Sequence, residues 1–218
     1  MLEKLNILFN QFRKKSLEVP VNSTISPEDI ARYNLNRTKN VSGTFCCAPS
    51  TNMLFAQDGS VRVCCHNLEY ITGKYPEQSI DEIWNSTITG ELSQSLKNYN
   101  LSKGCKVCQQ NIDIGAYEES ASRYFDTLPQ NRKYPVMMEF LLSNTCNLEC
   151  EMCQGDFSSL IRKNREKRPP LQSPYGNEFI KQLHPYLLQL SEARFSGSGE
   201  AFAIDIYYEI WETLINEN

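Results

Sequence analysis

Residues 136–153 read VMMEFLLSNTCNLECEMC. The first seven residues, Val136 to Leu142, form an apolar run of the length of a β-strand. Cys146, Cys150 and Cys153 follow this run, separated by three and then by two residues. A cubane iron-sulfur cluster is normally held by four cysteine thiolates, so a compact set of three leaves one iron open to an exogenous ligand. Three such cysteines could equally belong to a zinc site or to a structural thiol cluster.

A second segment, Ala193 to Phe202, reads ARFSGSGEAF, which indicates a short strand that runs into a glycine-rich turn with one carboxylate. Glycine tolerates positive φ and allows close approach of the backbone to a ligand. Taken alone, such a turn is a common connection between a strand and a helix. It gains weight here because it lies one helical unit after the three cysteines.

Together the two segments resemble the radical S-adenosylmethionine (radical SAM) superfamily. Its signature is three cysteines with this spacing, placed after the first strand of a barrel. The resemblance implies a 4Fe-4S cluster on Cys146, Cys150 and Cys153. It also implies that the amino and carboxylate groups of S-adenosyl-L-methionine chelate the open iron.

The same resemblance assigns roles to residues around the cofactor. Met152 matches the position near the adenine, and Gly197 and Gly199 match the turn that approaches the methionyl end. Glu200 matches the carboxylate that receives the ammonium group. The common form of this motif has adjacent glycines and a proline after the acid, where this chain has Ala201.

The other six cysteines precede this stretch and form three pairs: Cys46-Cys47, Cys64-Cys65 and Cys105-x-x-Cys108. Two alternating apolar segments lie between the first two pairs and are joined by Asp58-Gly59, a strong hairpin signal. A hairpin here would bring the two doublets together. Ser79, with Glu82 three residues later, predicts a capped helix that continues toward Leu96 and returns the chain to the third pair.

Residues 45–110 resemble the auxiliary-cluster module of radical SAM enzymes, called SPASM in its long form and twitch in its short form. Cys46, Gly59 and Cys64 satisfy its opening spacing. The later run of closely spaced cysteines is absent from the sequence, which implies one auxiliary 4Fe-4S cluster and two clusters in all. In familiar members this module follows the barrel, whereas here it precedes the barrel.

A cluster needs four thiolates and the module offers six. We assign Cys46, Cys64, Cys105 and Cys108 as ligands of the auxiliary cluster. Adjacent residues of a strand point to opposite faces, so only one member of each doublet can face the cluster, and the alternates are Cys47 and Cys65. A zinc ribbon remains the structural alternative.

The cysteine loop is followed by a β-α-β-α pattern, which favours a parallel barrel. The expected elements are helices at Ser158–Lys167 and Asn177–Leu190, a strand at Glu192–Ser196 and a helix at Ile204–Ile215. The expected fold class is therefore α/β: a small α+β iron-sulfur (SPASM/twitch-like) domain, then the first βα units of a partial (β/α) TIM-type barrel.

The expected organisation of the chain follows from these assignments. The segments are an N-terminal helix and lead-in (1–44), the auxiliary domain (45–110), a linker (111–134) and the incomplete barrel (135–218). A complete eight-unit barrel takes about 250 residues, and two units cannot close one. We therefore expect a fragment, a truncated gene product or one half of a split protein, inactive on its own.

With 218 residues, 40 % apolar content and a net charge of −4, the sequence predicts a soluble globular protein without a nucleic-acid footprint. The basic run Arg162 to Arg168 is interpreted as a solvated helix end or loop.

The cysteine count is odd and the N-terminus lacks the apolar core of a signal peptide, so reduced thiols in the cytoplasm are expected. No apolar stretch approaches the roughly 20 residues needed to span a membrane. The apolar residues between Leu5 and Phe12 predict a short amphipathic helix packed on the protein body.

The expected function is that of a radical SAM enzyme. It would cleave S-adenosyl-L-methionine reductively to give a 5'-deoxyadenosyl radical, with an external one-electron reductant and a peptide or protein substrate. No catalytic acid, base or hydrogen donor can be named from the sequence. The alternative is a noncatalytic iron-sulfur or zinc protein that transfers electrons or presents a binding surface.

Overall fold

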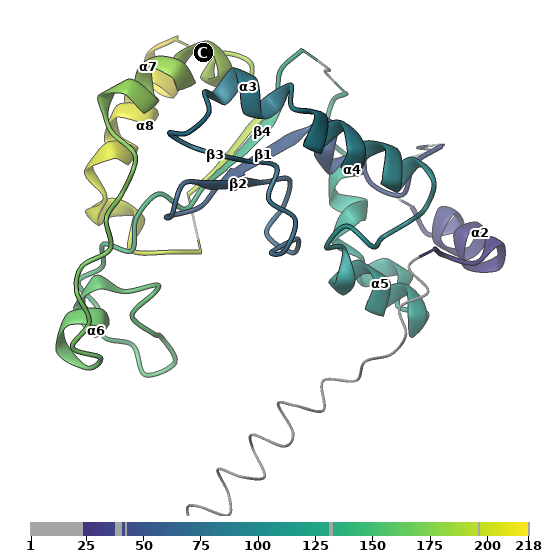
Figure 1. Ribbon diagram of the computed structural model, residues 1–218, viewed down its shortest axis with the longest axis horizontal. Helices are drawn as coiled ribbons and strands as arrows, with labels where there is room; N and C mark the ends of the chain where they lie inside the picture. Colours follow the sequence, from purple (N-terminus) through teal and green to yellow (C-terminus); the bar gives the residue numbers. More distant parts are fainter. Residues whose placement is uncertain (1–23, 38–40, 42, 131–132, 196, 218) are drawn as a thin grey trace, which may run out of the picture.

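The computed structural model describes residues 24–37, 41, 43–130, 133–195 and 197–217. The N-terminal helix expected before Phe12 lies outside these residues. The described chain is an α/β structure built on a five-stranded mixed sheet with the order β3-β2-β1-β4-β5 (Figure 1). The strands are β1 (Asn52–Phe55), β2 (Ser60–Arg62), β3 (Gly73–Lys74), β4 (Met137–Phe140) and β5 (Glu192–Arg194).

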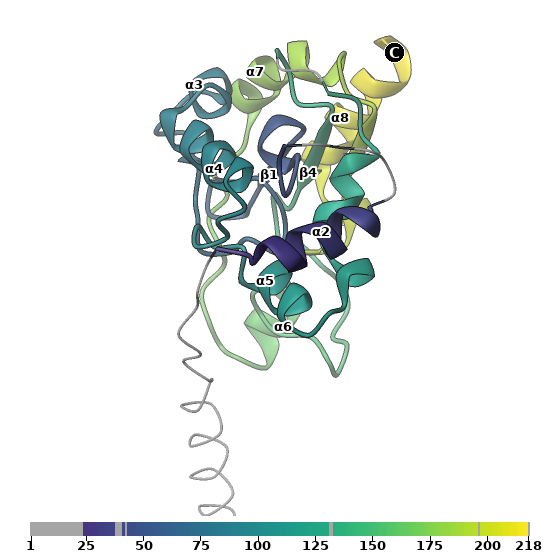
Figure 2. The same ribbon diagram turned by 90° about the vertical axis from the view of Figure 1, so that its right-hand side faces the viewer.

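The helices lie on both sides of this sheet, as Figures 1 and 2 show. The α-helices are α2 (Pro27–Leu35), α3 (Ile80–Trp84), α4 (Thr87–Lys97), α5 (Lys106–Asp113), α6 (Ser159–Asn164), α7 (Asn177–Leu187) and α8 (Asp205–Glu217). Four 3-10 helices are η1 (Ala48–Ser50), η2 (Tyr117–Glu119), η3 (Ala121–Asp126) and η4 (Ala201–Ala203). No helix in the described ranges combines the length and apolarity that a membrane crossing requires.

The hairpin predicted at Asp58-Gly59 is confirmed. Strands β1 and β2 pair antiparallel, with Leu54 opposite Arg62. Gly59 has φ +83°, and a Cβ at this position would collide with the Tyr75 carbonyl oxygen. Only glycine therefore fits this turn, because the turn needs both positive φ and close contact with the segment after β3.

Strand β1 also pairs with β4, in parallel, and the sequence did not predict this pairing. The register places Asn52 opposite Met137 and Phe55 opposite Phe140. A single sheet thus joins the predicted auxiliary domain to the strand that leads into the cysteine loop. All four residues of β1 are buried, because neighbouring strands flank β1 on both edges and other elements cover both faces.

Two apolar cores lie on the two faces of the sheet. Since side chains alternate along a strand, Met138 and Phe140 of β4 join a core with α3, α7 and α8, while Met137 joins a core with α2, α4 and α5. Both cores contain residues from before and after the predicted linker. Within that segment, η2 and η3 are short 3-10 helices, and the buried Phe125 and Leu128 pack against the body of the protein.

Most other predicted elements are present with shifted ends. A capping box at Ser79 begins α3, as predicted, but the expected continuous helix toward Leu96 is interrupted at Asn85, and Ser86 caps a separate helix, α4. Strands β4 and β5 are parallel, as the β-α-β-α pattern predicted. The described strands form an open sheet with β3 and β5 at its edges, so the fold is α/β, and the first units of a barrel stay a prediction.

Candidate iron-sulfur sites

Two cysteine-bearing regions lie at opposite ends of the parallel strands β1 and β4. The loop with Cys146 follows the carboxyl end of β4, whereas Cys64 follows β2, which runs antiparallel to β1 and ends beside the start of β1. In Figure 1, α6 lies at the lower left and α5 at the lower right. The loop of Cys146, Cys150 and Cys153 leads into α6, and Cys105 and Cys108 lie at the start of α5. We call the first group the triad and the group of Cys46, Cys64, Cys105 and Cys108 the quartet.

The fold brings the quartet together from three separate segments. Cys46 precedes η1, Cys64 follows β2, and the other two cysteines lie at the N-terminus of α5. Burial raises the pKa of the Cys46 thiol well above its usual value, and the nearby Cys108, Cys64 and Cys105 raise that pKa further. Burial and Cys108 together raise the pKa of Cys105 to about 12. Cys46, Cys64 and Cys105 are partly buried and pack against the core that contains the buried Cys108, so the four thiols lie around one part of the protein.

The second members of the two doublets differ in their surroundings. Burial raises the pKa of the Cys47 thiol, and the charges that act on that thiol come from Asp126 and Arg37 rather than from another cysteine. Cys65 is exposed, and burial of its thiol, then the charge of Glu139 and also the nearby Cys108 raise its pKa, so Cys65 stays an alternate to Cys64. Both doublets lie outside the strands, before η1 and after β2, so the strand alternation expected for them does not apply, and the choice within each doublet stays a prediction.

A buried ion pair that the sequence analysis missed supports the segment before Cys46. Arg37 and Asp126 have side-chain exposures of 1 % and 0 %, and Nε and Nη2 of Arg37 donate to the two carboxylate oxygens at 2.7 and 2.6 Å. Nη1 of Arg37 donates to the Thr44 carbonyl at 2.5 Å. The two partners are 89 positions apart, so no local sequence pattern predicts their contact. A fully paired arginine of this kind fixes the position of the segment that precedes Cys46.

Polar groups around the quartet were likewise not foreseen. The backbone N–H of Ala48 lies 3.4 Å from Cys46 Sγ and donates to it. Burial raises the pKa of the Cys108 thiol, whereas the hydroxyls of Ser120 and Ser122 lower it. Donors of this kind stabilise a thiolate, and hydrogen bonds to sulfur also tune the potential of a bound cluster.

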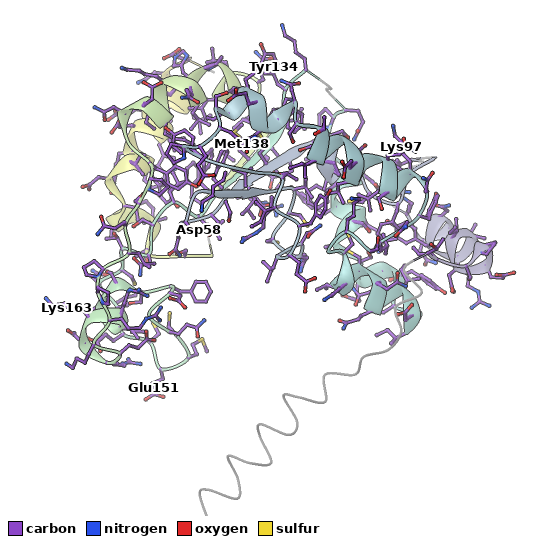
Figure 3. The ribbon with its side chains drawn as sticks, in the orientation of Figure 1. Asp58, Lys97, Tyr134, Met138, Glu151 and Lys163 are labelled. Atoms are coloured by element: carbon purple, nitrogen blue, oxygen red, sulfur yellow. The ribbon has the colours of Figure 1, made fainter. Side chains whose placement is uncertain are left out.

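The triad lies on a loop that hydrogen bonds attach to α6. Ser159 Oγ accepts from the Cys146 backbone N–H at 3.1 Å, and Ser158 Oγ donates to the Leu148 carbonyl at 2.8 Å. The Leu148 N–H donates in turn to Cys146 Sγ at 3.4 Å. Cys150 is exposed, as is Met152, and Cys146 and Cys153 are half-buried. Figure 3 shows Glu151 at the outer tip of this loop, pointing away from the body of the protein.

The basic run after the triad forms ion pairs with the cysteine loop. Arg165 pairs with Glu149 at 3.2 Å, and Arg168 pairs with Asp156 at 2.8 Å. Arg162 is buried and lies 3.0 Å from Asp156. The prediction that this run is a solvated helix end is therefore correct only in part, because three of its arginines form ion pairs with the loop.

The glycine-rich turn meets the cysteine loop directly. The Gly199 N–H donates to the Phe157 carbonyl at 3.0 Å, and the Glu200 N–H donates to the Thr145 carbonyl at 2.8 Å. Gly197 and Gly199 have φ of +94° and +68°. The two motifs that the sequence analysis singled out thus lie side by side, and the half-buried Glu200 belongs to this junction.

These contacts lie at one edge of the sheet, where the carboxyl ends of parallel strands meet and where α/β proteins commonly bind ligands. Gln57, in the turn after β1, donates to the Asp156 carbonyl at 2.9 Å and also contacts Ser198. Ser198 donates to the Ser143 carbonyl at 3.0 Å. The turns after β1, β4 and β5 are therefore joined.

The donor chemistry fits two iron-sulfur clusters. The quartet supplies the four thiols that a cubane takes, and the triad supplies three on one exposed loop. Across the described ranges, no three Cys, His, Asp or Glu side chains converge closely enough to hold a single metal ion. A cubane spreads its thiolates over separate irons, one to each, so the four sulfurs of the quartet need not meet at one point.

Comparison with known proteins gives one family match. Residues 46–109 match SPASM, an iron-sulfur cluster-binding domain. This range contains the whole quartet and confirms the SPASM part of the resemblance. No curated protein and no solved structure matches the chain.

Proposed function

We propose that the chain acts as a radical SAM enzyme with one auxiliary 4Fe-4S cluster. The observation that carries this proposal is the direct contact between the triad loop and the Gly-x-Gly-Glu turn, through the Glu200 and Gly199 N–H groups. The SPASM match also supports it, because SPASM domains are common in radical SAM enzymes. A simple electron carrier needs neither the open triad nor the turn.

In this proposal the triad holds the SAM-binding cluster, and the quartet holds the auxiliary cluster. S-adenosyl-L-methionine lies against Met152, Gly197 and Gly199, with its ammonium group at Glu200. A cluster held by the triad would pass one electron from the reductant to S-adenosyl-L-methionine, which would then split into methionine and a 5'-deoxyadenosyl radical. The protein holds the triad loop and the Gly-x-Gly-Glu turn next to each other. The proposed substrate is a peptide or protein, and the electron comes from an external reductant.

Iron and cleavage are measured together in the first test. The protein is reconstituted anaerobically with iron and sulfide, iron is quantified, and 5'-deoxyadenosine is assayed after dithionite reduction with S-adenosyl-L-methionine. About eight irons per chain with cleavage would support the whole proposal, and eight irons without cleavage would support two clusters in a chain that is inactive on its own. About four irons without cleavage would instead favour a noncatalytic iron-sulfur protein, the second candidate, which the SPASM match supports without the triad. Zinc or no metal would overturn both.

Cysteine variants assign the two clusters separately. Cys150→Ala should lose about half of the iron and all cleavage, and Cys105→Ala should lose the other half. Cys65→Ala is the matched control, because this exposed cysteine lies outside the proposed ligand sets. If Cys65→Ala loses as much iron as Cys105→Ala, the assignment within the doublets is wrong.

Glu200 is tested through cofactor binding. Glu200→Ala should weaken binding of S-adenosyl-L-methionine and leave the iron content unchanged, because only the contact to the ammonium group is lost. Glu151→Ala, at the exposed tip of the same loop, is the control and should bind normally (Figure 3). Equal affinity of both variants would reduce Glu200 to a loop carboxylate.

A further inference from the structure

Asn67 lies between two of the quartet cysteines. Its backbone N–H donates to the Cys64 carbonyl at 3.3 Å, and the residue is 1 % exposed. Its Nδ2 donates to the Lys103 carbonyl at 2.8 Å and to Cys105 Sγ at 3.7 Å. One buried side chain therefore connects the turn after Cys64 to the segment that carries Cys105.

The neighbouring groups fix the orientation of this amide. The Tyr70 N–H donates to Oδ1 at 3.1 Å, whereas the Lys103 carbonyl accepts from Nδ2. A flipped amide would place a donor against the Tyr70 N–H and an acceptor against the Lys103 carbonyl, so it would lose both bonds. The amide N–H that faces the Cys105 sulfur is thus set by the fold.

Gly104 makes this contact possible. It has φ +78°, and a Cβ at this position would collide with Asn67 Oδ1. Any side chain at residue 104 would therefore push the Asn67 amide out of place. The Asn67-Gly104 contact sets how closely the Cys105 segment approaches the turn.

We propose that Asn67 is a positioning residue of the auxiliary cluster: it fixes Cys64 relative to Cys105 and supplies a hydrogen-bond donor to the Cys105 sulfur. This inference rests on the proposed iron-sulfur function of the quartet. A donor to a ligating sulfur favours the reduced cluster, which carries more negative charge, and so raises the reduction potential. Loss of a partner just outside the ligands of a metal typically lowers metal affinity about 10- to 100-fold.

The test isolates the auxiliary cluster. Asn67→Asp and Asn67→Ala are made in the full chain carrying Cys150→Ala. Asn85→Ala is the control, because Asn85, the C-cap of α3, donates from Nδ2 to Asp81 of that helix and to no cysteine among the described residues. Iron content, the rate of iron loss to a chelator and the midpoint potential from an EPR-monitored redox titration are measured after reconstitution.

Both Asn67 variants should have a more negative potential than the parent. Asn67→Asp should show the larger shift, because it loses the donor and brings in a carboxylate, and both should lose iron faster. The Asn85→Ala control should match the parent. Potentials equal to the control would overturn the inference even if the Asn67 variants were less stable, because a merely structural residue would not shift the potential. A parent without about four irons would instead overturn the iron-sulfur assignment itself.

A double-variant cycle provides a second test. Gly104→Ala should speed iron loss in the Asn67 background, where the new Cβ meets the amide. In the Asn67→Ala background the same substitution should cost much less, because only the strain of positive φ remains. If Gly104→Ala has the same effect in both backgrounds, the contact does not position the cluster site.

Discussion

Glu139 is a buried carboxylate on β4, at the centre of the sheet. It is 6 % exposed and accepts a hydrogen bond from Asn52 Nδ2 at 2.7 Å. Burial raises the pKa of Glu139, and the Asn52 hydrogen bond and the charge of Arg194 offset part of this effect. Asn52 Nδ2 also donates to the Val63 carbonyl, directly before Cys64, so this polar link joins the strand of the triad to the quartet.

The raised pKa predicts a pH-dependent effect of Glu139→Gln. Above the usual glutamate pKa of 4.5, the unfolded chain releases this proton more readily than the folded chain does. The contribution of Glu139 to the free energy of unfolding is therefore full below pH 4.5 and falls as the pH rises through the folded pKa. Glutamine does not ionise and keeps an acceptor for Asn52 Nδ2. The variant should gain stability over the parent as the pH rises.

Urea unfolding of the cluster-free protein at pH 4.5 and at pH 8 measures this difference. A difference in free energy that is the same at both pH values would contradict a buried carboxylate with a raised pKa.

Gly199→Ala should destabilise the protein, because a Cβ there would lie 2.7 Å from the Thr145 carbonyl oxygen and φ is +68°. The left-handed conformation alone costs about 1–2 kcal/mol for a non-glycine residue. Gly90→Ala is the matched control: this glycine lies inside α4 with nothing within 4 Å of the place that a methyl group would take, and alanine there should add about 1 kcal/mol. Thermal unfolding of both variants should show a lower midpoint for Gly199→Ala and a higher midpoint for Gly90→Ala. An unchanged midpoint for Gly199→Ala would mean that the turn and the cysteine loop move apart to make room for the methyl group.

Among the elements, the short helix α3 depends on its cap. Ser79 Oγ accepts from the Glu82 N–H at 3.2 Å, and Glu82 Oε2 accepts from the Ser79 N–H at 2.8 Å. Ser79→Ala should lower the free energy of unfolding by about 1 kcal/mol. Ser93→Ala, inside α4, is the control and should be neutral or slightly stabilising, because alanine has the higher helix propensity. Equal losses in urea unfolding would show that the cap contributes nothing.

Local signals predicted the elements well. The capping box at Ser79 and the Asp58-Gly59 turn each depend on residues a few positions apart, and both are present. The break between α3 and α4 was missed because the apolar pattern continues through Asn85 and only the cap at Ser86 marks a new helix. The β1–β4 pairing joins strands more than 80 residues apart, and nothing within either strand specifies its partner.

At the scale of the whole molecule, the sequence predicted which cysteines group together but not what supports them. Spacing and hairpin geometry pointed to the quartet, and its members pack in or against one apolar core, while their role as ligands stays a prediction. The Arg37–Asp126 pair and the donors at Ser120 and Ser122 are contacts between distant segments, so they appear only once the chain is folded. The contact between the triad loop and Gly199 was implied by the resemblance, and backbone hydrogen bonds supply it.

Because they share one sheet, we expect the auxiliary domain (45–110) and the C-terminal segment (135–218) to unfold together. The core on the α7 and α8 side contains Trp84 of α3 and Phe55 of β1 as well as Met138 and Phe140 of β4, and Trp211 packs against it. Neither segment therefore has a complete core of its own, and cooperative units follow contiguous cores. We expect a single unfolding transition for the described body.

The two tryptophans report on the two segments separately, because the chain has no others. Trp84→Phe leaves Trp211 as the fluorescent probe, and Trp211→Phe leaves Trp84. In each variant the urea midpoint from fluorescence should coincide with the midpoint from far-ultraviolet circular dichroism, and this comparison within one variant removes any change in stability that the substitution itself causes. If the Trp84 signal persisted to higher urea than the Trp211 signal, residues 45–110 would form an independent unit, and the β1–β4 pairing would be a contact between two domains rather than the centre of one core.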